Sequence, residues 1–188
     1  MPRVVDVDER RNELAAAAAR VIAREGIGGA SMREVAAEAG WTTGTLVHYF
    51  TNKRDLLRFT LESSLERRRE RRTDRAEMTA AEALRDTLVS ALPLDDDSTL
   101  HWVVTVAFCS QAAGDSELAT IQRDAYRSFR ASVAGLIEAA TGDRSDAALE
   151  EAERLITIVD GVALQALFDR DSWPPARQLA ALDRGLAG

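Results

Sequence analysis

The sequence is poor in cysteine, proline and aromatic residues. Of its 188 residues one is cysteine, four are proline and 5% are aromatic. The single Cys109 excludes an intrachain disulfide, and two histidines 53 positions apart do not provide the ligand spacing of a metal site, so we expect no metal and no cofactor. No apolar run is long enough to span a bilayer and no apolar N-terminal signal is present, which predicts a cytoplasmic protein without membrane contact.

The scarcity of proline and the abundance of alanine favour helix throughout the chain. The prolines stand at positions 2, 93, 174 and 175, and no strand-like alternation of apolar and polar residues is visible between them. A composition of 46% hydrophobic and 29% charged residues is that of an ordinary globular protein. The sequence therefore predicts an all-α fold, with about nine helices.

Residues 31–53, SMREVAAEAGWTTGTLVHYFTNK, carry the most informative pattern. Ser31 is a good N-cap, and Glu34 three residues later completes a capping box, which predicts a helix that starts at Ser31. Gly40 can end that helix in the left-handed region, and a threonine two or three residues later can cap the next one. A helix, a tight turn and a second helix form the layout of a helix-turn-helix DNA reader.

The second of these helices, about Thr43 to Tyr49, is short and polar, and a helix of this length is not stable by itself. Leu46 and Phe50 are four residues apart and can anchor one face, which leaves hydroxyl groups, an imidazole and a phenol facing outward. Such groups contact phosphates and base edges, and valine or threonine methyl groups can meet a thymine methyl.

A further helix begins after this segment, with Asn52 as its N-cap and Lys53 in its first turn. A cation is usually disfavoured there by the helix dipole. A phosphate bound at this end would reverse that cost, because free backbone N–H groups and the ammonium would then both face an anion. Lys53, the single lysine of the chain, is therefore a candidate phosphate contact.

The charge is unevenly divided along the chain. Residues 1–54 hold eight basic and seven acidic residues, whereas residues 55–188 hold 16 basic and 24 acidic ones, and the net charge of the whole is −7. The acidity therefore lies downstream of the DNA reader. A reader with so little net charge contacts few phosphates by itself, so tight binding would need two subunits acting together.

The segment TTGTLVHYFTNKRDLL resembles the recognition-helix signature of the tetracycline-repressor (TetR) family, and the preceding REGIGGASMREVAAEAGW matches the same family's approach to that helix. The match covers about residues 10–57. The resemblance implies a homodimeric transcriptional regulator, usually a repressor that binds a palindromic operator and is released by a small ligand. It also implies a three-helix DNA-binding domain over residues 1–54 and a helical bundle for ligand binding and dimerisation over residues 55–188.

Carried over by position, the resemblance implies DNA contacts on two neighbouring helices and at the start of the next. The residues are Ser31, Arg33, Thr42, Thr43, Gly44, Thr45, Val47, His48, Tyr49 and Lys53. Two positions depart from the family's pattern, because Trp41 stands where a small aliphatic residue is more frequent and Val47 where an aromatic one often stands. The family's base preference therefore does not transfer to this chain.

Clear helix breaks after residue 78 predict a second set of longer amphipathic helices. We expect these helices at about residues 79–92, 98–113, 116–140, 143–168 and 175–186. The first helix of the chain, about residues 8–24, places its apolar residues on one stripe, which would pack against the reader.

The segment LITIVDGVALQALF presents apolar side chains around most of its helical circumference, more than one core contact can cover. A surface that binds a partner is one explanation, and burial of a central helix within its own subunit is the other. The resemblance favours the first, because the last two helices of each subunit form a four-helix dimer interface in this family. The expected interface residues are Leu155, Ile158, Val159, Val162, Ala163, Ala166 and Leu167.

A small-molecule effector site is expected among the middle helices. Aromatic and polar residues share one broad face of the helix after residue 98, and two more are available from the next helix. Such a stripe fits plain core packing equally well, and the usual position of the family's pockets is what favours a ligand. The candidate lining residues are His101, Trp102, Thr105, Phe108, Cys109, Tyr126 and Phe129.

Two functions of other classes remain open. A helical enzyme would need a nucleophile with a base or paired carboxylates in an apolar setting, and neither occurs at a recognisable spacing, so we expect no catalytic residues. The other is a helical bundle that binds partners through the second domain without binding DNA. The basic run ERRRERR at 66–72 and the acidic residues 95–97 are most simply solvated charges.

Overall fold

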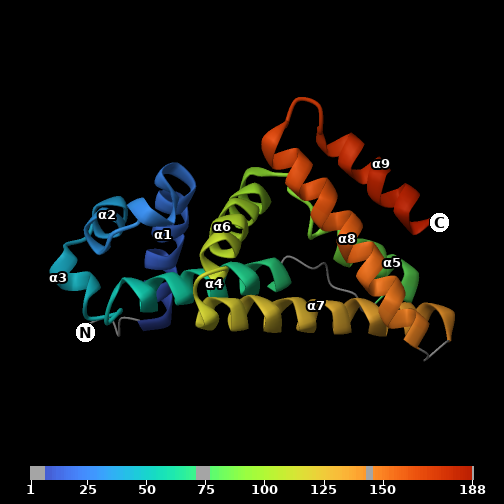
Figure 1. Ribbon diagram of the computed structural model, residues 1–188, viewed down its shortest axis with the longest axis horizontal. Coiled ribbons are helices and arrows are strands. Elements are labelled where there is room, and N and C mark those ends of the chain that lie inside the picture. Colours follow the sequence, from blue (N-terminus) through green and yellow to red (C-terminus); the bar gives the residue numbers. More distant parts are fainter. Residues whose placement is uncertain (1–6, 71–76, 143–145, 188) are drawn as a thin grey trace. The chain divides into compact units, whose positions relative to one another are not determined.

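The computed structural model describes residues 7–70, 77–142 and 146–187, which hold nine α-helices (Figure 1). This confirms the predicted all-α fold. The helices are α1 (Val7–Gly29), α2 (Met32–Glu38), α3 (Thr43–Leu46), α4 (Lys53–Glu70), α5 (Ala80–Val89), α6 (Asp96–Ala112), α7 (Ser116–Thr141), α8 (Asp146–Phe168) and α9 (Pro175–Leu186). Within these ranges no helix combines the length and the apolar character needed to cross a bilayer.

Two of the predicted segments lie partly outside the described residues. They are the end of the basic run at 66–72 and residues 143–145, which were expected to start the penultimate helix. The interpretation of the basic run as solvated charge therefore stays a prediction.

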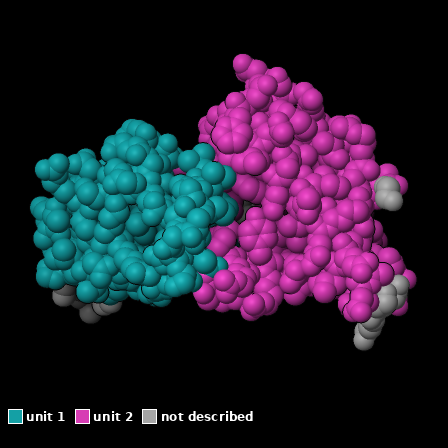
Figure 2. Space-filling view, viewed as in Figure 1, with its two compact units in different colours: residues 1–67, 103–119 teal, residues 68–102, 120–188 magenta. Residues whose placement is uncertain are grey.

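The chain forms two compact units (Figure 2). Unit 1 comprises residues 1–67 and 103–119, and unit 2 comprises residues 68–102 and 120–188. The chain of α6 and the chain of α7 therefore each contribute to both units. The predicted domain boundary between residues 54 and 55 falls in the first turn of α4 and stays a prediction.

Unit 1 is built on the apolar stripe of α1. Leu14, Val21 and Ile22 are buried, as their helical spacing predicts. α1 extends beyond its predicted end to Gly29, through a kink at Gly26 whose φ of 71° lies in the left-handed region that glycine adopts without a Cβ penalty. The same core also holds Leu46, Phe50, Leu56 and Leu61.

One carboxylate joins α2 to α1. Arg20 Nε donates to Glu38 Oε1 at 2.7 Å, and Arg24 Nη1 donates to Glu38 Oε2 at 3.0 Å. The hydrogen bonds from Arg20 and then from Arg24 hold the pKa of Glu38 below its usual range, because they favour the charged carboxylate. These ion pairs are exposed, so their effect on stability is modest and depends on salt.

Arg11 of α1 lies between two aromatic rings. Its guanidinium carbon is 5.0 Å from the centre of the Phe50 ring and 4.2 Å from the centre of the Phe59 ring. Its Nε is buried without a hydrogen-bond partner, so contact with the ring faces takes the place of a hydrogen bond at this atom. The stack ties α1 both to the segment between α3 and α4 and to α4 itself.

Unit 2 is built around α8. Leu155, Val159 and Ala163 on its inner face are at most 1% exposed. Both α5 and α9 pack against α8. The approach of α9 is close, because a Cβ added at Gly185 would lie 2.9 Å from Ile158 Cδ1. Unit 2 is therefore held by a central helix whose inner apolar face is buried within its own subunit.

Aspartates rather than the expected hydroxyl residues cap two of the helices. Ser98 or Thr99 was expected to open α6, but the helix begins at Asp96, and Asp95 Oδ1 accepts the Ser98 N–H at 2.7 Å. Ser116 was expected to cap α7, but Asp115 Oδ1 accepts the backbone N–H groups two and three residues later, at 3.0 and 3.3 Å. A carboxylate at these positions also suits the positive end of the helix dipole.

Candidate functional site

The start of α2 confirms the predicted cap but only half of the predicted capping box. Ser31 Oγ accepts the Glu34 N–H at 3.1 Å. The Ser31 N–H donates to Gly29 O at 2.7 Å, and the Glu34 carboxylate accepts from the Arg33 guanidinium at 3.1 Å. Arg33 is strongly exposed, with 84% of its side chain accessible. It remains available to an approaching duplex, whereas the Ser31 hydroxyl is already engaged.

The turn between α2 and α3 is a Schellman motif centred on Gly40. The Trp41 N–H donates to Ala36 O at 2.8 Å, and the Gly40 N–H donates to Ala37 O at 3.1 Å. Gly40 has a φ of 73°, as its predicted role as a helix terminator requires. This turn fixes α3 against α2, and the helix-turn-helix layout is confirmed.

α3 spans Thr43–Leu46 and ends three residues before its predicted end. Thr42 is its N-cap, since Thr42 Oγ1 accepts the Thr45 N–H at 3.1 Å and lies 2.9 Å from Thr45 Oγ1. After Leu46 the backbone tightens into i→i+3 hydrogen bonds that end the α-helix. The Thr42 hydroxyl, which belongs to the predicted DNA-contact set, therefore caps the start of α3.

Buried residues on the opposite side of α3 anchor its outward face. Leu46 and Phe50 are fully buried and anchor it, as predicted. The exposed residues are Thr43, Gly44, Thr45, Val47 and His48. Val47 is 51% exposed, and the side chains of Thr43 and His48 make no hydrogen bond with any residue that the structure describes. The Thr43 hydroxyl and the His48 imidazole are thus presented without hydrogen-bond partners among the described residues, next to the exposed methyl groups of Val47.

Tyr49 is half-buried, because its ring rests against Trp41. The two ring centres are 5.5 Å apart with an interplanar angle of 61°, an edge-to-face contact. The Arg10 guanidinium lies 5.4 Å from the centre of the Trp41 ring and is paired with Glu13 at 2.8 Å. The unusual tryptophan therefore acts as a support for Tyr49, a role that no local sequence signal could identify.

Lys53 closes the end of α1. Its Nζ donates to Ile27 O at 2.9 Å and to Gly28 O at 3.1 Å. Carbonyl groups at a helix C-terminus are unpaired and partly negative, so a cation is favoured there. These carbonyls offset the unfavourable dipole of α4 without a bound phosphate. The predicted phosphate contact stays a prediction, and the remaining N–H of the ammonium would have to make it.

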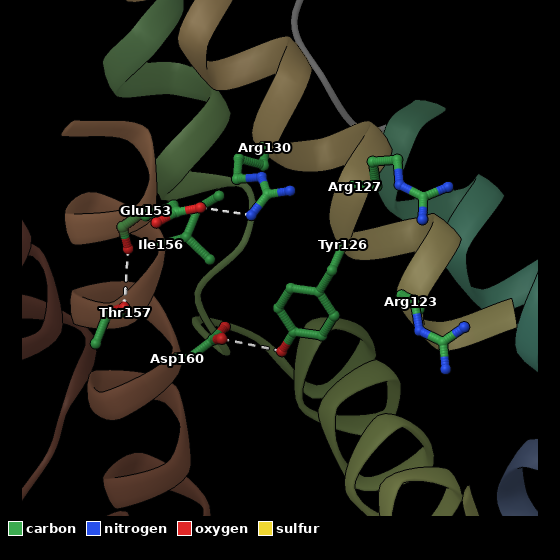
Figure 3. A pocket seen from close by; sticks show the side chains of 8 residues that line it. All are labelled: Arg123, Tyr126, Arg127, Arg130, Glu153, Ile156, Thr157 and Asp160. Atoms are coloured by element: carbon green, nitrogen blue, oxygen red, sulfur yellow. Dashed lines mark hydrogen bonds and ion pairs between the residues drawn. The ribbon is translucent and has the colours of Figure 1, made fainter. Parts of the chain in front are cut away.

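A cavity of about 480 Å³ opens in unit 2 between α7 and α8 (Figure 3). Tyr126 reaches across it and donates to Asp160 Oδ2 at 2.9 Å, and Arg130 forms an ion pair with Glu153. The eight lining residues are Arg123, Tyr126, Arg127, Arg130, Glu153, Ile156, Thr157 and Asp160.

Comparison with known proteins decides the family. Residues 14–58 match the family model of bacterial regulatory proteins of the tetR family, and residues 80–188 match the C-terminal domain of BetI-type transcriptional repressors. The chain belongs to the TetR family. The HTH-type transcriptional regulator PksA of Bacillus subtilis (strain 168) is 32% identical over 172 residues, which are 90% of this chain and 84% of PksA.

Solved structures agree with the assignment of this chain to the TetR family. A transcriptional regulator from Rhodococcus sp. Rha1 is 31% identical and superposes with a TM-score of 0.83 over 94% of both chains. A putative transcriptional regulator from Saccharomonospora viridis, solved in complex with choline, is 23% identical, with a TM-score of 0.84 over 96% of both chains. The chain is thus a DNA-binding transcriptional regulator and not an enzyme.

The predicted effector residues of this TetR regulator divide between the two units. His101, Trp102, Tyr126 and Phe129 belong to unit 2, and Thr105, Phe108 and Cys109 belong to unit 1. Trp102 is buried and donates from Nε1 to Ala91 O at 2.7 Å, whereas Cys109 is exposed. The cavity between α7 and α8 includes Tyr126 alone of this set. The assignment of the seven residues to a ligand site stays a prediction.

Sequence reasoning missed the three arginines of the cavity. A usable signal was present, because Arg123, Arg127 and Arg130 are spaced i, i+4 and i+7 and share one face of α7. The missing knowledge was which helix faces them. Among the described residues, no cluster of three or more His, Cys, Asp or Glu side chains suits a metal ion.

Most of the predicted dimer residues are covered by their own subunit. The buried ones are Leu155, Val159, Val162, Ala163 and Ala166, while Ile158 and Leu167 are half-buried. The apolar residues of α8 that the single chain leaves exposed are different ones. Leu149 and Leu164 are each 42% exposed and Phe168 is 78% exposed, and Gly161, next to the last two, is exposed as well.

Proposed function

We propose that this regulator is a homodimeric repressor that binds a palindromic operator and is released from it by a small molecule. The observation that carries the proposal is the outward face of α3, where Thr43 and His48 are exposed and lack hydrogen-bond partners among the described residues. Polar groups so placed suit contacts with base edges in a major groove. Binding to chromosomal DNA would place the protein in the cytoplasm.

The dimer proposal rests on α8. An exposed stripe at helical spacing runs through Gly161, Leu164 and Phe168, and an exposed phenylalanine is costly for a monomer in water. The residues predicted from sequence would then support the interface from beneath, and this stripe would touch the partner. Two copies of the reader would add their few phosphate contacts on one duplex.

Release by a ligand is supported by the choline complex of the Saccharomonospora viridis relative and by a link within unit 1. Arg54, in the first turn of α4, pairs with Asp115 at 2.9 Å and with Glu117 at 2.8 Å. Asp115 also caps α7. A ligand-induced shift at the start of α7 would therefore act on α4, the helix that follows α3 in the chain. Coupling between such sites is typically about 1 to 3 kcal/mol.

Footprinting and gel-shift experiments on the upstream region of the protein's own gene test the function. We expect protection of a roughly palindromic site with half-site centres about 34 to 36 Å apart and an affinity that falls steeply with salt. Thr43→Ala and His48→Ala should change which sites are bound, because these side chains would face base edges. Glu150→Gln, at an exposed position of α8 in unit 2, should leave the site preference unchanged.

A partner-binding bundle without DNA binding is the competing function. It would show no protected site at any salt concentration, although the chain is folded. That result would contradict the repressor proposal.

A further inference from the structure

The cavity between α7 and α8 has the size of a site for a small molecule. Its volume of about 480 Å³ falls within the range of roughly 300 to 1,000 Å³ that is common for such sites. All of its lining residues belong to unit 2. Binding of a ligand in this cavity would therefore not depend on how the two units are placed relative to one another.

Each wall of the cavity is one face of one helix. The contributing positions on α7 are i, i+3, i+4 and i+7, and the same spacing recurs on α8, so four side chains of each helix point the same way. On α7 they are Arg123, Tyr126, Arg127 and Arg130, and on α8 they are Glu153, Ile156, Thr157 and Asp160. Figure 3 shows Tyr126 and Arg130 of α7 reaching toward Asp160 and Glu153 of α8.

Both acidic groups of the cavity are already engaged by the opposite wall. Arg130 pairs with Glu153, and the Tyr126 hydroxyl donates to Asp160 at 2.9 Å. The first contact neutralises a carboxylate, and the second satisfies an oxygen of the other carboxylate with a hydroxyl donor. Neither carboxylate is therefore well placed to attract a cationic ligand.

The arginines are in excess over the carboxylates. Arg127 pairs with Asp124 on its own helix at 2.9 Å, and its side chain is 65% exposed. Arg123 makes no hydrogen bond or ion pair with any residue in the described part of the chain. Three guanidinium groups thus line the cavity against two carboxylates. Arg123 thus offers N–H donors and a positive charge that no described residue of the protein uses, and Arg127 is engaged only by an exposed pair on its own helix.

We propose that this cavity binds a small organic anion that carries a carboxylate or a phosphate group. Arg123 and Arg127 lie one helical turn apart and hold the anionic group, since guanidinium matches the geometry of both oxyanions. The Tyr126 ring and Ile156 contact the apolar part of the ligand. The inference rests on the proposed ligand-released function and gives its effector a charge opposite to that of choline.

Isothermal titration calorimetry on the full chain tests this site without DNA. The probes are benzoate and phenyl phosphate as the two anions, benzyl alcohol as a neutral control and choline as a cation. We expect saturable binding of at least one anion, and the stronger of the two identifies the preferred group. Arg123→Gln should weaken that binding by about tenfold or more, because one charged hydrogen-bond partner is lost.

Arg184→Gln is the matched control, since it removes the same charge from an exposed arginine of α9 outside the cavity. It should leave anion binding unchanged. Tyr126→Phe is the second variant, and it should weaken binding less than Arg123→Gln because the ring remains. Equal melting temperatures of the variants and the parent chain show that loss of binding is not loss of folding.

Anion binding that survives both Arg123→Gln and Arg127→Gln would overturn the proposal, and so would a preference for choline. Absence of anion binding in a chain that still protects its operator would overturn the site and leave the regulator function intact. Calorimetric binding that depends on Arg123, in a chain that protects no operator, would support the site and contradict the repressor function.

Discussion

Single side chains in this regulator serve two needs at once. Lys53 was predicted from its position to meet a phosphate, yet its ammonium is bonded to the last carbonyls of α1. Thr42 belongs to the predicted DNA contacts and also caps α3. The pattern of residue types identified these positions, but the intramolecular partners could not be predicted, since Lys53 and Ile27 are 26 positions apart and two turns of unknown geometry lie between them.

Lys53→Met should therefore affect both folding and binding. We expect a loss of about 1 kcal/mol in the free energy of unfolding, measured by urea denaturation, because the carbonyl groups lose a charged donor while the side-chain stem is kept. The slope of log affinity against log salt should also fall by about one phosphate contact, with site preference unchanged.

Arg33→Met is the control for the stability effect, since Arg33 is 84% exposed and contacts only the adjacent Glu34 among the described residues. It should leave the free energy of unfolding almost unchanged. An unaltered stability of Lys53→Met would contradict its role at the end of α1, and an unaltered salt slope would remove Lys53 from the phosphate contacts.

At the scale of elements, local signals predicted most of the helix-turn-helix. Ser31 and Gly40 delimit α2 as expected, because caps and left-handed glycines depend on neighbours within a few residues. The signals were weaker where two candidates competed, and Asp115 rather than Ser116 caps α7. The cavity was not predictable at all, because it needs the register of α7 against α8, which no local spacing encodes.

Gly40→Ala tests whether the turn depends on glycine. A Cβ at this position would meet nothing within 4 Å, so the cost is that of the left-handed backbone alone, about 1 to 2 kcal/mol in the free energy of unfolding. Gly135→Ala is the matched control, because it also meets open space but lies inside α7 without a positive φ, and it should stabilise by about 0.5 to 1 kcal/mol. Equal effects in urea denaturation would contradict this account of the turn.

At the scale of the whole molecule, the exposed end of α8 raises the question of assembly. Periodicity predicted a helix with more apolar surface than one contact covers, and the structure divides that surface. Its larger part, including Leu155 and Val159, lies in the core of unit 2, and Leu164 and Phe168 remain outside. The sequence pattern could not make this division, because it does not show which faces of α8 are covered by α9 and by α5, which comes from a distant part of the chain.

Phe168→Asp should convert the proposed dimer into a folded monomer. The side chain is 78% exposed in the single chain, so its loss costs the subunit little, whereas a buried unpaired carboxylate would be costly in an interface. Sedimentation velocity at micromolar concentration measures the change. Val7→Asp, which replaces another exposed apolar residue at the start of α1, should leave the dimer intact. A parent chain that sediments only as a monomer would contradict the dimer proposal.

The interleaving of the two units along the chain bears on how the protein can be divided. Residues 103–119 belong to the same compact unit as the helix-turn-helix, and Asp115 within them forms an ion pair with Arg54. A truncation after residue 67 would remove part of the compact unit that contains the helix-turn-helix, so a stand-alone DNA-binding fragment is a poor design for this chain. A chimaera that joins this DNA-binding region to the ligand-binding region of another protein would therefore have to retain residues 103–119 as well.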